Sequence, residues 1–447
     1  MPPTQPRPFD VVIVGARCAG SPLATLLARR GLRVAVVERA TFPSDTMSSH
    51  VFEADGIVFL DRLGVIDEVL ATGAPAVTRG DARAEDFLWS GPMPHRPGDL
   101  GFGMSVRRTV LDPILAGAAA HAGAELHMGT EVKGLVENDG RVAGVRVKTK
   151  TGDRELRARL VVGADGRSST VAKLCGAREY NVTHNERAAY WAYFENAGPG
   201  SDPAFVMHRW ADRLVLGIPC DSGLYQVALM PELSQLNGFR RNLEAGFMEH
   251  ALSCEPVADA LRGARRAGKI LGCVRWSGFF REPSGPGWVL VGDAGHFKDP
   301  AAGRGIGDAF TQADTVAGVI ADGMAGSDES LDHALARWGR RRDAEFAEYY
   351  WLAVEIGKGG RVPAVLPELL RGLEARGRLD LFFELYLKRS LPSKVGTVPR
   401  LLAATTRVVK DRPGERRAVL AEVAGLAADE VRRRRLNRRP RFESARS

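Results

Sequence analysis

Residues 9–20 read FDVVIVGARCAG, an apolar run that ends at a glycine turn. The run predicts a buried strand, and the small residues after it predict a helix over 20–30. Gly15 can adopt the backbone angles of a sharp strand-to-helix turn, and Gly20 lets the helix pack closely on the sheet. A second apolar run follows at 34–37. The pattern is typical of a βαβ unit whose helix N-terminus binds the pyrophosphate of a dinucleotide.

Glu38 is the predicted ribose ligand of this unit. It follows Gly20 by 18 residues, close to the spacing of ~20 expected of an acidic residue that accepts hydrogen bonds from ribose hydroxyls. The motif departs from GxGxxG at one position, because Arg17 stands where the middle glycine is expected. A side chain there must point away from the phosphates or pair with them. We expect Arg17 to pair with them or to support their ligands indirectly.

Two further glycine-rich segments lie far along the chain. They are GADGRS at 163–168 and VLVGDAGHFKDP at 289–300, which continues through GRGIGDA to Ala309. Asp293 follows a fully apolar strand, so it should lie where a parallel sheet presents its carboxyl ends to a ligand. The helix expected over 306–324 would direct its N-terminal N–H groups at an anionic ring.

Together the three segments resemble those of the FAD-dependent monooxygenase superfamily that includes p-hydroxybenzoate hydroxylase. Geranylgeranyl reductases and flavin-dependent halogenases are more distant members of the same fold. The resemblance covers residues 9–330. It implies an α/β fold with a Rossmann-like FAD-binding domain and an antiparallel-sheet substrate domain, to which the charged sequence after residue 345 adds a helical C-terminal region. The Trp-x-Trp-x-Ile-Pro motif of the halogenases is not found, which disfavours a halogenase.

The resemblance also implies which residues contact FAD. Asp293 would hold a ribityl hydroxyl. Asp165 and Gly166 would lie near the pyrophosphate and the nicotinamide cofactor, and Val132 would recognise the adenine through its backbone. The complete predicted set is Gly15, Ala16, Ala19, Gly20, Glu38, Arg39, Arg108, Val132, Asp165, Gly166, Asp293, Pro300, Gly303, Gly305 and Ile306.

Structural roles compete with several of these assignments. Arg108 matches an Arg-x-x-Leu spacing whose arginine contacts FAD, with Arg107 as the second choice, but either arginine could lie in water at a strand end. Asp293 could be an N-cap after a buried strand, and Asp165 a turn residue before a glycine.

His50 is the one predicted catalytic residue. Loops after the second strand of this fold pass over the flavin, so His50 and Ser48 could touch the ring or the substrate. A histidine titrates near neutral pH and could shuttle a proton or stabilise a peroxide oxygen. The alternative is a residue at the N-terminus of the helix expected from Glu53, with Ser49 as its cap. His296 either packs beside the flavin or bonds within its own loop.

The pattern along the chain predicts three parts. Their boundaries are 1–76, 101–175 and 286–345 for the FAD-binding domain, 77–100 and 176–285 for the substrate domain, and 346–447 for the C-terminal region. Aromatic residues alternate with polar ones over 188–230, which predicts strands of a second sheet. Such a sheet would roof an apolar pocket, or its aromatic residues would pack on a helix.

The chain ends in a basic run, RRRRLNRRPR at 432–441, which supplies most of the formal net charge of +8. We expect this tail to be solvated or disordered. No recognition helix, zinc finger or stacking platform accompanies it, so nucleic-acid binding has little support.

Length and composition fit a large globular enzyme. At 447 residues the chain can bury a substantial core. No apolar run approaches the ~20 residues of a membrane span, and the N-terminus lacks a hydrophobic signal core, so we expect a cytoplasmic protein without a membrane span. The five cysteines form no CxxC pair and suit a reducing compartment. No metal-ligand cluster is found in the sequence, so no metal is expected.

Three functions are compatible with these features. The preferred one is an FAD-dependent monooxygenase that uses NADH or NADPH and O2 to hydroxylate an electron-rich, aromatic or apolar small molecule through a flavin C4a-hydroperoxide. The second is a reductase of isolated double bonds, similar to the geranylgeranyl reductases. The third is a flavoprotein that acts on or docks a peptide or protein partner, including a peptide-borne substrate. The sequence leaves the oligomeric state open.

Overall fold

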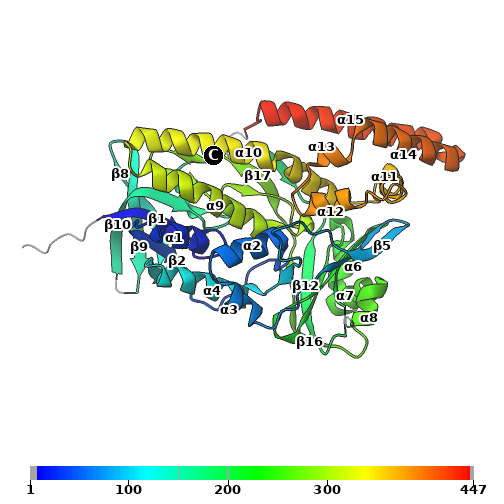
Figure 1. The fold of residues 1–447 in the computed structure, drawn as a ribbon, viewed down its shortest axis with the longest axis horizontal. Coiled ribbons are helices and arrows are strands. Elements are labelled where there is room, and N and C mark those ends of the chain that lie inside the picture. Colours follow the sequence, from blue (N-terminus) through cyan, green and yellow to red (C-terminus); the bar gives the residue numbers. More distant parts are fainter. Residues whose placement is uncertain (1–7, 151, 199, 201, 443–447) are drawn as a thin grey trace, which may run out of the picture.

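The computed structural model of the protein describes residues 8–150, 152–198, 200 and 202–442. These residues form the predicted mixed α/β fold, with a Rossmann-like unit, a second and largely antiparallel sheet, and a helical C-terminal region (Figure 1). In that view the Rossmann-like unit lies on the left, the second sheet lies below on the right, and the last helices lie above it. The exact domain boundaries given above stay predictions.

A parallel sheet organises the Rossmann-like unit. Its central strand β1 (Phe9–Val14) pairs in parallel with β10 (Gly152–Gly163) on one side and with β2 (Val34–Glu38) on the other. β10 then pairs in parallel with β19 (Trp288–Leu290), and β2 with β7 (Glu125–Met128). Because parallel strands share a direction, the segments that follow β1, β2, β10 and β19 all emerge at one edge of the sheet. The three glycine motifs therefore converge there.

Further elements surround this sheet. The helices are α1 (Gly20–Ala28), α2 (Ala54–Arg62), α3 (Ile66–Leu70), α4 (Arg108–His121), α5 (Thr170–Leu174) and α9 (Gly305–Gly323). The strands are β3 (Val51–Phe52), β6 (Met104–Ser105), β8 (Glu131–Asn138), β9 (Arg141–Thr149) and β18 (Ser284–Gly285). Helices α1, α4 and α9 share an apolar core with one face of β1, and the antiparallel hairpin of β8 and β9 shares a core with the other face.

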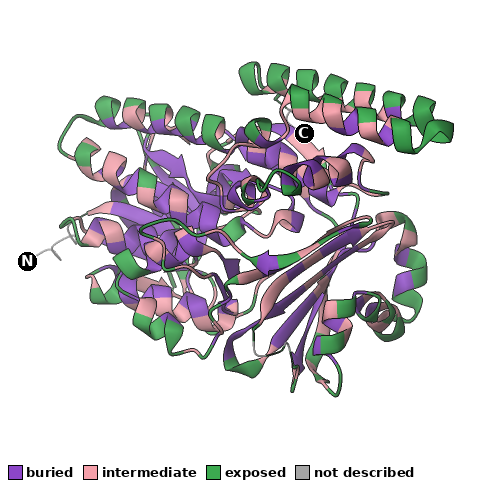
Figure 2. Ribbon diagram, turned by 45° about the vertical axis from the view of Figure 1, so that its right-hand side comes forward, coloured by how far each residue is buried: buried purple, intermediate pink, exposed green. Residues whose placement is uncertain are grey.

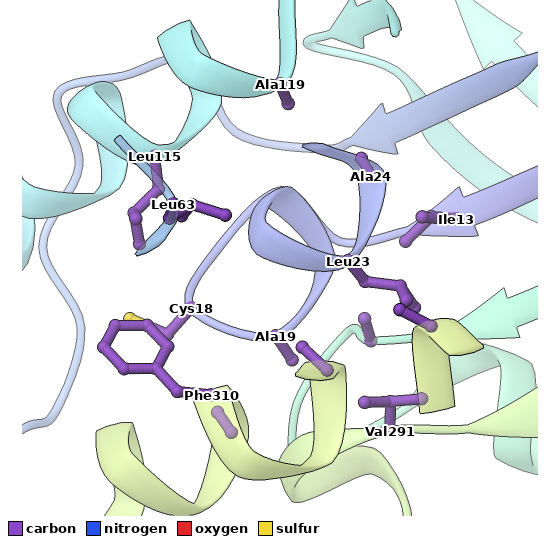
Figure 3. Close-up of a cluster of buried hydrophobic side chains, with 14 of the residues drawn as sticks. Ile13, Cys18, Ala19, Leu23, Ala24, Leu63, Leu115, Ala119, Val291 and Phe310 are labelled. Carbon is purple, nitrogen blue, oxygen red and sulfur yellow. The ribbon is translucent and has the colours of Figure 1, made fainter. Parts of the chain in front are cut away.

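Helix α1 lies at the centre of the first core. Figure 3 shows Leu115 and Ala119 of α4 close to one part of this helix and Phe310 of α9 close to another. All of these side chains are buried. A Cβ on Gly20 would lie 1.8 Å from the carbonyl oxygen of Gly15, so only glycine lets the helix begin this close to the end of β1.

The second sheet contains seven described strands in the order β16-β12-β15-β14-β13-β4-β5. Their bounds are β4 (Arg79–Ala84), β5 (Phe87–Pro92), β12 (Ala189–Glu195), β13 (Ala204–Trp210), β14 (Arg213–Pro219), β15 (Tyr225–Leu229) and β16 (Arg265–Cys273). Every pair is antiparallel except β13 with β4. Segment 77–100 therefore shares a sheet with the strands expected over 188–230.

One face of the second sheet packs on short helices, and a small sheet joins it to the Rossmann-like unit. The helices are α6 (Leu236–Arg241), α7 (Leu243–Leu252) and α8 (Glu255–Ala260), and the small sheet contains β11 (Glu179–His184), β17 (Ser277–Arg281) and β20 (His296–Phe297). Tyr190 and Phe194 of β12 belong to the core that the sheet shares with these helices. These two aromatic residues therefore pack on helices, which is one of the two roles that we considered for the aromatic residues of this sheet. The opposite face of the sheet is left for the C-terminal region.

The C-terminal region contains six α-helices in its described part. They are α10 (Asp328–Gly357), α11 (Val365–Glu374), α12 (Asp380–Tyr386), α13 (Pro392–Val395), α14 (Val398–Asp411) and α15 (Arg416–Arg438). Two arginines, one just before β12 and one in β13, hold the end of α10. Arg187, fully buried, donates to the carbonyl of Lys358 at 2.8 Å, and Arg209 donates to that of Glu355 at 2.7 Å. Cations at a helix C-terminus satisfy its unpaired carbonyls and its dipole.

The basic tail is ordered, in contrast to the disordered end that was one of our expectations. It forms the end of α15, whose outer surface is largely exposed (Figure 2). Trp351 Nε1 donates to Asn437 at 2.9 Å, and the N–H of Asn181 donates to the carbonyl of Arg441 at 3.2 Å. Among the residues that the structure describes, none of the helices combines the length and apolar character needed to cross a bilayer.

We expect Gly20→Ala to destabilise the protein by about 1–3 kcal/mol or more, because the new methyl group would overlap the Gly15 carbonyl. Gly117→Ala is the matched control, since it lies inside α4, where an added Cβ would meet no atom within 4 Å and would raise helix propensity. Urea denaturation of both variants would check this. Equal stability of the two variants would contradict the close contact at Gly20.

Candidate functional site

The three glycine motifs touch one another at the carboxyl edge of the parallel sheet. Gly15 has a φ of +105°, and a Cβ there would lie 2.4 Å from the carbonyl oxygen of Ala164 in the second motif. Gly292 of the third motif has a φ of +62°, and a Cβ there would lie 2.9 Å from the Cβ of Ala19. Both positions need glycine for their backbone angles and for space. Segments far apart in the sequence therefore form one cradle of backbone.

Glu38 lies buried beside the first turn of this cradle. Its carboxylate accepts hydrogen bonds from the N–H groups of Ala16 at 3.0 Å and Ala40 at 2.9 Å. The first of these N–H groups belongs to the turn itself, so the carboxylate lies next to the start of α1. Glu38 thus braces the turn from the position that a ribose ligand requires.

Asp293 lies in a short 3-10 turn directly after β19. Its carboxylate has no hydrogen-bond partner among the described residues. Burial raises the pKa of Asp293 to about 6, although the nearby Arg108 guanidinium acts in the opposite direction. A desolvated carboxylate without a hydrogen-bond donor is unfavourable, and a ligand hydroxyl would supply the missing donor. The geometry therefore fits a residue that binds such a hydroxyl.

Two neighbouring arginines have different partners. Arg107 donates from Nε at 2.9 Å and from Nη2 at 2.7 Å to Asp221, and so joins the Rossmann-like unit to the second sheet. Within the described chain, Arg108 donates only from Nε, to Asp112 at 2.8 Å. The free edge of the Arg108 guanidinium is therefore available for a phosphate or ribose oxygen. Of the two arginines, Arg108 has the geometry of a ligand.

Arg17 is engaged by protein groups. Its Nη1 lies 2.6 Å from Asp112, and its Nη2 donates to Ser44 at 2.7 Å. The guanidinium also lies 5.4 Å from the centre of the Phe42 ring. Arg17 and Arg108 thus share one buried carboxylate. This matches the indirect supporting role, one of the two roles that we considered for Arg17.

The third motif shapes the start of α9. Gly303 adopts a left-handed conformation with a φ of +69°, and its carbonyl accepts a hydrogen bond from Ser49 Oγ at 3.2 Å. Pro300 begins a 3-10 turn capped by Asp299, which accepts a hydrogen bond from the N–H of Ala301 at 2.9 Å. Gly305 opens α9 with free space around it. The N-terminal N–H groups of α9 can therefore face an anionic ligand.

The remaining predicted contacts differ in their surroundings. Asp165 accepts hydrogen bonds from Ser169 Oγ and from the N–H groups of Thr170 and Val171, so its carboxylate caps α5. We had considered a turn residue before a glycine as the structural alternative for Asp165, and its contact with the pyrophosphate stays a prediction. The structure places Gly166 beside open space, Arg39 on the surface at the end of β2, and Val132 and Ile306 in buried positions. Their contacts with FAD stay predictions.

His50 is fully buried and is not among the residues that line the apolar cavity described below. Its Nε2 bonds to the Tyr193 hydroxyl, and its backbone has a φ of +62°. Burial, helped by Arg108, lowers the pKa of His50 to about 3, so the ring is neutral at ordinary pH. Ser49 does not cap α2, because Glu53 stands at that position. The catalytic role of His50 stays a prediction.

His296, for which two roles were open, is also buried and neutral. Burial lowers its pKa well below the ordinary value, and no hydrogen bond is found to either of its ring nitrogens within the described chain. The ring packs among Phe280, Phe346 and Tyr350. This surrounds it with aromatic side chains, as in an ordinary core.

An apolar cavity of about 340 Å³ lies between the second sheet and helices α10 to α13. Its lining includes Phe87, Trp89, Phe205, Met207, Phe382 and Phe383. Ser49, Val51 and residues 301–303 also line it, so the cavity reaches the loop before α9. This volume is within the range of pockets for drug-sized molecules.

One charged group at this cavity was not predicted from the sequence. Glu53 lines the cavity, and its carboxylate lies 2.6 Å from Arg304, which also bonds to Asp55 at 2.9 Å. Burial raises the pKa of Glu53. Glu53 and Arg304 are separated by most of the chain, so no local motif could connect them. An acid before an apolar helix indicates by itself only the start of that helix.

Comparison with known proteins agrees with this geometry. Residues 8–210 match the family described as FAD binding domain. The chain is 27% identical over 361 residues to 6-methylpretetramide 4-monooxygenase of Streptomyces rimosus, which covers 77% of this chain and 83% of the relative. It is 28% identical over 348 residues to digeranylgeranylglycerophospholipid reductase of Methanocella arvoryzae, covering 76% and 83%. The chain is thus similar to a monooxygenase and to a reductase over about three quarters of its length, and its first half matches an FAD binding domain.

Two further proteins are similar to the chain, one in sequence and one in fold. A 1H-pyrrole-2-carbonyl-[peptidyl-carrier protein] chlorinase of Pseudomonas fluorescens is 26% identical over 379 residues, covering 77% of this chain and 83% of the relative. The solved p-nitrophenol 4-monooxygenase of Pseudomonas putida superposes with a TM-score of 0.68 at 17% identity, covering 88% of this chain and 98% of that one. This second similarity concerns the fold.

The residues present fit FAD. The glycine cradle would be filled by any added Cβ, Asp293 lacks a protein partner within the described chain, and the Arg108 guanidinium has a free edge. Together with Glu38 and the start of α9, these groups offer ligands for a ribityl hydroxyl, a phosphate, a ribose and an anionic ring.

We expect Asp293→Asn to have opposite effects on cofactor binding and on the FAD-free protein. FAD retained through purification should fall at least about tenfold, because a charged hydrogen bond is lost. The native pKa lies above the ordinary value, so wild type loses stability as pH rises through the interval up to about 6. The FAD-free variant should therefore be more stable than wild type at pH 7.5, by about 1 kcal/mol or more in the free energy of unfolding, and should melt at a higher temperature. This difference in stability should be smaller at pH 5.

Absorbance at the flavin band and thermal melts at both pH values would measure these effects. Asp322→Asn, at an exposed site in α9, is the matched control. Normal flavin content in Asp293→Asn would contradict the site.

Arg107→Met and Arg108→Met should separate folding from cofactor binding. Arg107→Met leaves the buried Asp221 without its cation and should destabilise the fold by about 3–5 kcal/mol. Arg108→Met leaves Asp112 paired with Arg17, so the fold should survive while the Kd for FAD rises about 10- to 100-fold. Denaturation and fluorescence titration with FAD would measure both. If Arg108→Met bound FAD normally, its free edge would have no role.

Proposed function

We propose that the protein is an FAD-dependent monooxygenase that hydroxylates an electron-rich, aromatic or apolar molecule with O2 and NADH or NADPH. The single observation that carries this proposal is the apolar cavity next to the predicted flavin site. Ser49, Val51 and residues 301–303 belong both to the cavity lining and to the loops around the start of α9. A substrate in the cavity would therefore lie beside the cofactor and away from bulk water.

The side chains of the cavity suit a planar or chain-like apolar substrate. Trp89 and Phe383 lie with ring centres 4.1 Å apart on the wall formed by β5 and α12. Phe205 and Met207 line the cavity from β13 of the same sheet. Burial of apolar surface is the main source of affinity in such a pocket, and aromatic walls also favour stacking.

The groups of the cradle would hold the cofactor and support its redox chemistry. FAD, when bound and reduced by NADH or NADPH, supplies the electrons that activate O2. The free N-terminal N–H groups of α9 would stabilise negative charge on the reduced ring. Asp293, Glu38 and Arg108 would fix its ribityl, ribose and phosphate groups, so that the ring stays at the wall of the cavity.

Reduction of isolated double bonds is the second candidate. It is favoured by the sequence similarity to digeranylgeranylglycerophospholipid reductases and by a cavity that would equally accept an isoprenoid chain. Halogenation has less support from the residues. The chlorinase similarity is of the same order, but β14 reads Leu214-Val215-Leu216-Gly217-Ile218-Pro219, with leucine at both tryptophan positions of the halogenase motif. A carrier-borne substrate, as named for that relative, is compatible with any of these reactions.

We expect the FAD-loaded protein to oxidise NADH or NADPH and to consume O2, with both rates rising at least about tenfold when an apolar phenol binds, because a filled cavity excludes water from the flavin. The product should be 16 Da heavier than the substrate and should carry label from 18O2. An oxygen electrode and mass spectrometry would measure this.

Other outcomes would replace the proposal. A product gain of 2 Da without O2 would indicate the reductase, and a halide-dependent product would indicate a halogenase. A protein that binds FAD but is reduced by neither nicotinamide would favour a docking role. The Asp322→Asn variant should behave as wild type in each assay.

A further inference from the structure

We infer that the cavity takes an uncharged substrate, anchored at a hydroxyl group by Glu53, and rejects free carboxylic acids. This inference rests on the proposed function and deepens it by naming the substrate class. It follows from the partners of the charged side chains around the cavity.

The arginines at the cavity are occupied elsewhere. Arg209 donates from Nη1 at 2.7 Å and from Nη2 at 3.1 Å to carbonyls at the end of α10. Arg83 donates from Nε to the carbonyl of Glu85 at 2.7 Å and lies over the Trp210 ring, 4.7 Å from its centre. Within the described chain, no other cationic side chain lines the cavity. The Arg209 guanidinium is therefore not free to bind a carboxylate, whereas Arg83 is held at Nε and against the Trp210 ring.

A buried lysine next to the cavity is also held by other groups. Leu387 lines the cavity, but the adjacent Lys388 does not. Its Nζ lies 2.9 Å from Asp308 and 3.7 Å from the centre of the Phe346 ring. This buried ammonium is held by a carboxylate and an aromatic face, so it cannot act as a counter-ion for a ligand without breaking both contacts.

The wall next to α9 carries more carboxyl groups than cations. Arg304 is the one guanidinium there among the described residues, and it is shared by Glu53 and Asp55. Asp81, the remaining charged residue of the lining, bonds to His208 at 2.5 Å. An anionic ligand at this wall would therefore lose its hydration, find no unshared cation and meet a carboxyl group.

Glu53 can recognise a neutral polar group. Its Oε2 lies against Arg304, whereas no hydrogen bond to its Oε1 is found within the described chain. The rest of the lining offers mostly apolar and aromatic side chains, together with the hydroxyls of Ser49 and Tyr386. A substrate hydroxyl that donates to Glu53 Oε1 would satisfy the carboxyl group and place the hydroxyl-bearing ring at the wall next to the predicted flavin site.

The test compares ligands of one shape and different charge on the FAD-loaded protein. Anthracen-2-ol, anthracene and anthracene-2-carboxylate would be titrated at pH 7.5 while quenching of tryptophan fluorescence is recorded. We expect anthracen-2-ol to bind most tightly and the carboxylate about 100-fold more weakly, because it is buried without a cation. The variant Trp89→Phe should reduce the quenching, since this indole lines the cavity.

The variants Glu53→Gln and Glu53→Met identify the anchor. Glu53→Gln keeps an acceptor and should change the affinity for anthracen-2-ol less than about threefold, whereas Glu53→Met should weaken it about tenfold without affecting anthracene. Far-ultraviolet circular dichroism checks that each variant is folded. Tight binding of the carboxylate that is lost in Arg209→Met would overturn the inference, because it would show that this arginine is free to bind anions.

Failure of this inference is distinguishable from failure of the proposed function. The titrations use no nicotinamide and measure no turnover. Preference for the neutral ligand in a protein that never consumes O2 would support the inference while refuting the monooxygenase. Hydroxylation of an aromatic acid bound in this cavity would support the monooxygenase while overturning the inference.

Discussion

Close contact between backbones at the carboxyl edge of the parallel sheet is the constraint on which the rest of the structure depends. Gly20 faces the Gly15 carbonyl, Gly15 faces Ala164, and Gly292 faces Ala19, each at a distance that leaves no room for a side chain. These contacts bring the ends of strands from three parts of the chain together. Glu38, Arg108 and the start of α9 take their places around the same point. The stability of the fold and the shape of the cofactor site therefore depend on the same few glycines.

A second set of contacts joins the sheet to the C-terminal helices and also defines the cavity. Arg187, which lies just before β12, and Arg209 of β13 donate to the carbonyls at the end of α10. The helix that closes the cavity is thus held by the same arginine that would otherwise offer a charge inside it. Burial lowers the pKa of Arg209, in keeping with a guanidinium surrounded by protein. The attachment of α10 to the second sheet thus also removes the charge of Arg209 from ligand binding, and in this way it contributes to ligand selectivity.

The backbone of the site could be predicted from the sequence because its signals are local. Glycine turns after apolar strands define the geometry within a few residues, so the motifs at Gly15 and Asp293 were placed correctly in the fold. Side-chain partners were harder to predict. Arg17 pairs with Asp112, and Glu53 with Arg304, across separations that no motif spans.

Other features escaped prediction for different physical reasons. Strand β16 reads RRAGKILGC and lacks the alternation that marks a strand, because tertiary pairing with β12 outweighs its weak propensity. Charge composition suggested a solvated or disordered tail, yet packing against Trp351 and Asn181 orders it. The hydrogen bonds of the Asp165 carboxylate to the first N–H groups of α5 were not predicted, because neither of the two roles considered for this residue involved a helix.

Helix α15 also makes the distribution of charge over the molecule uneven. It contains seven arginines and three acidic residues, and most of its surface faces water. Because like charges repel, this positively charged helix opposes the association of two copies of the protein through their α15 surfaces. The same repulsion disfavours aggregation. The protein should consequently adhere to a cation-exchange matrix through one edge, with that attachment weakening steeply as salt is added.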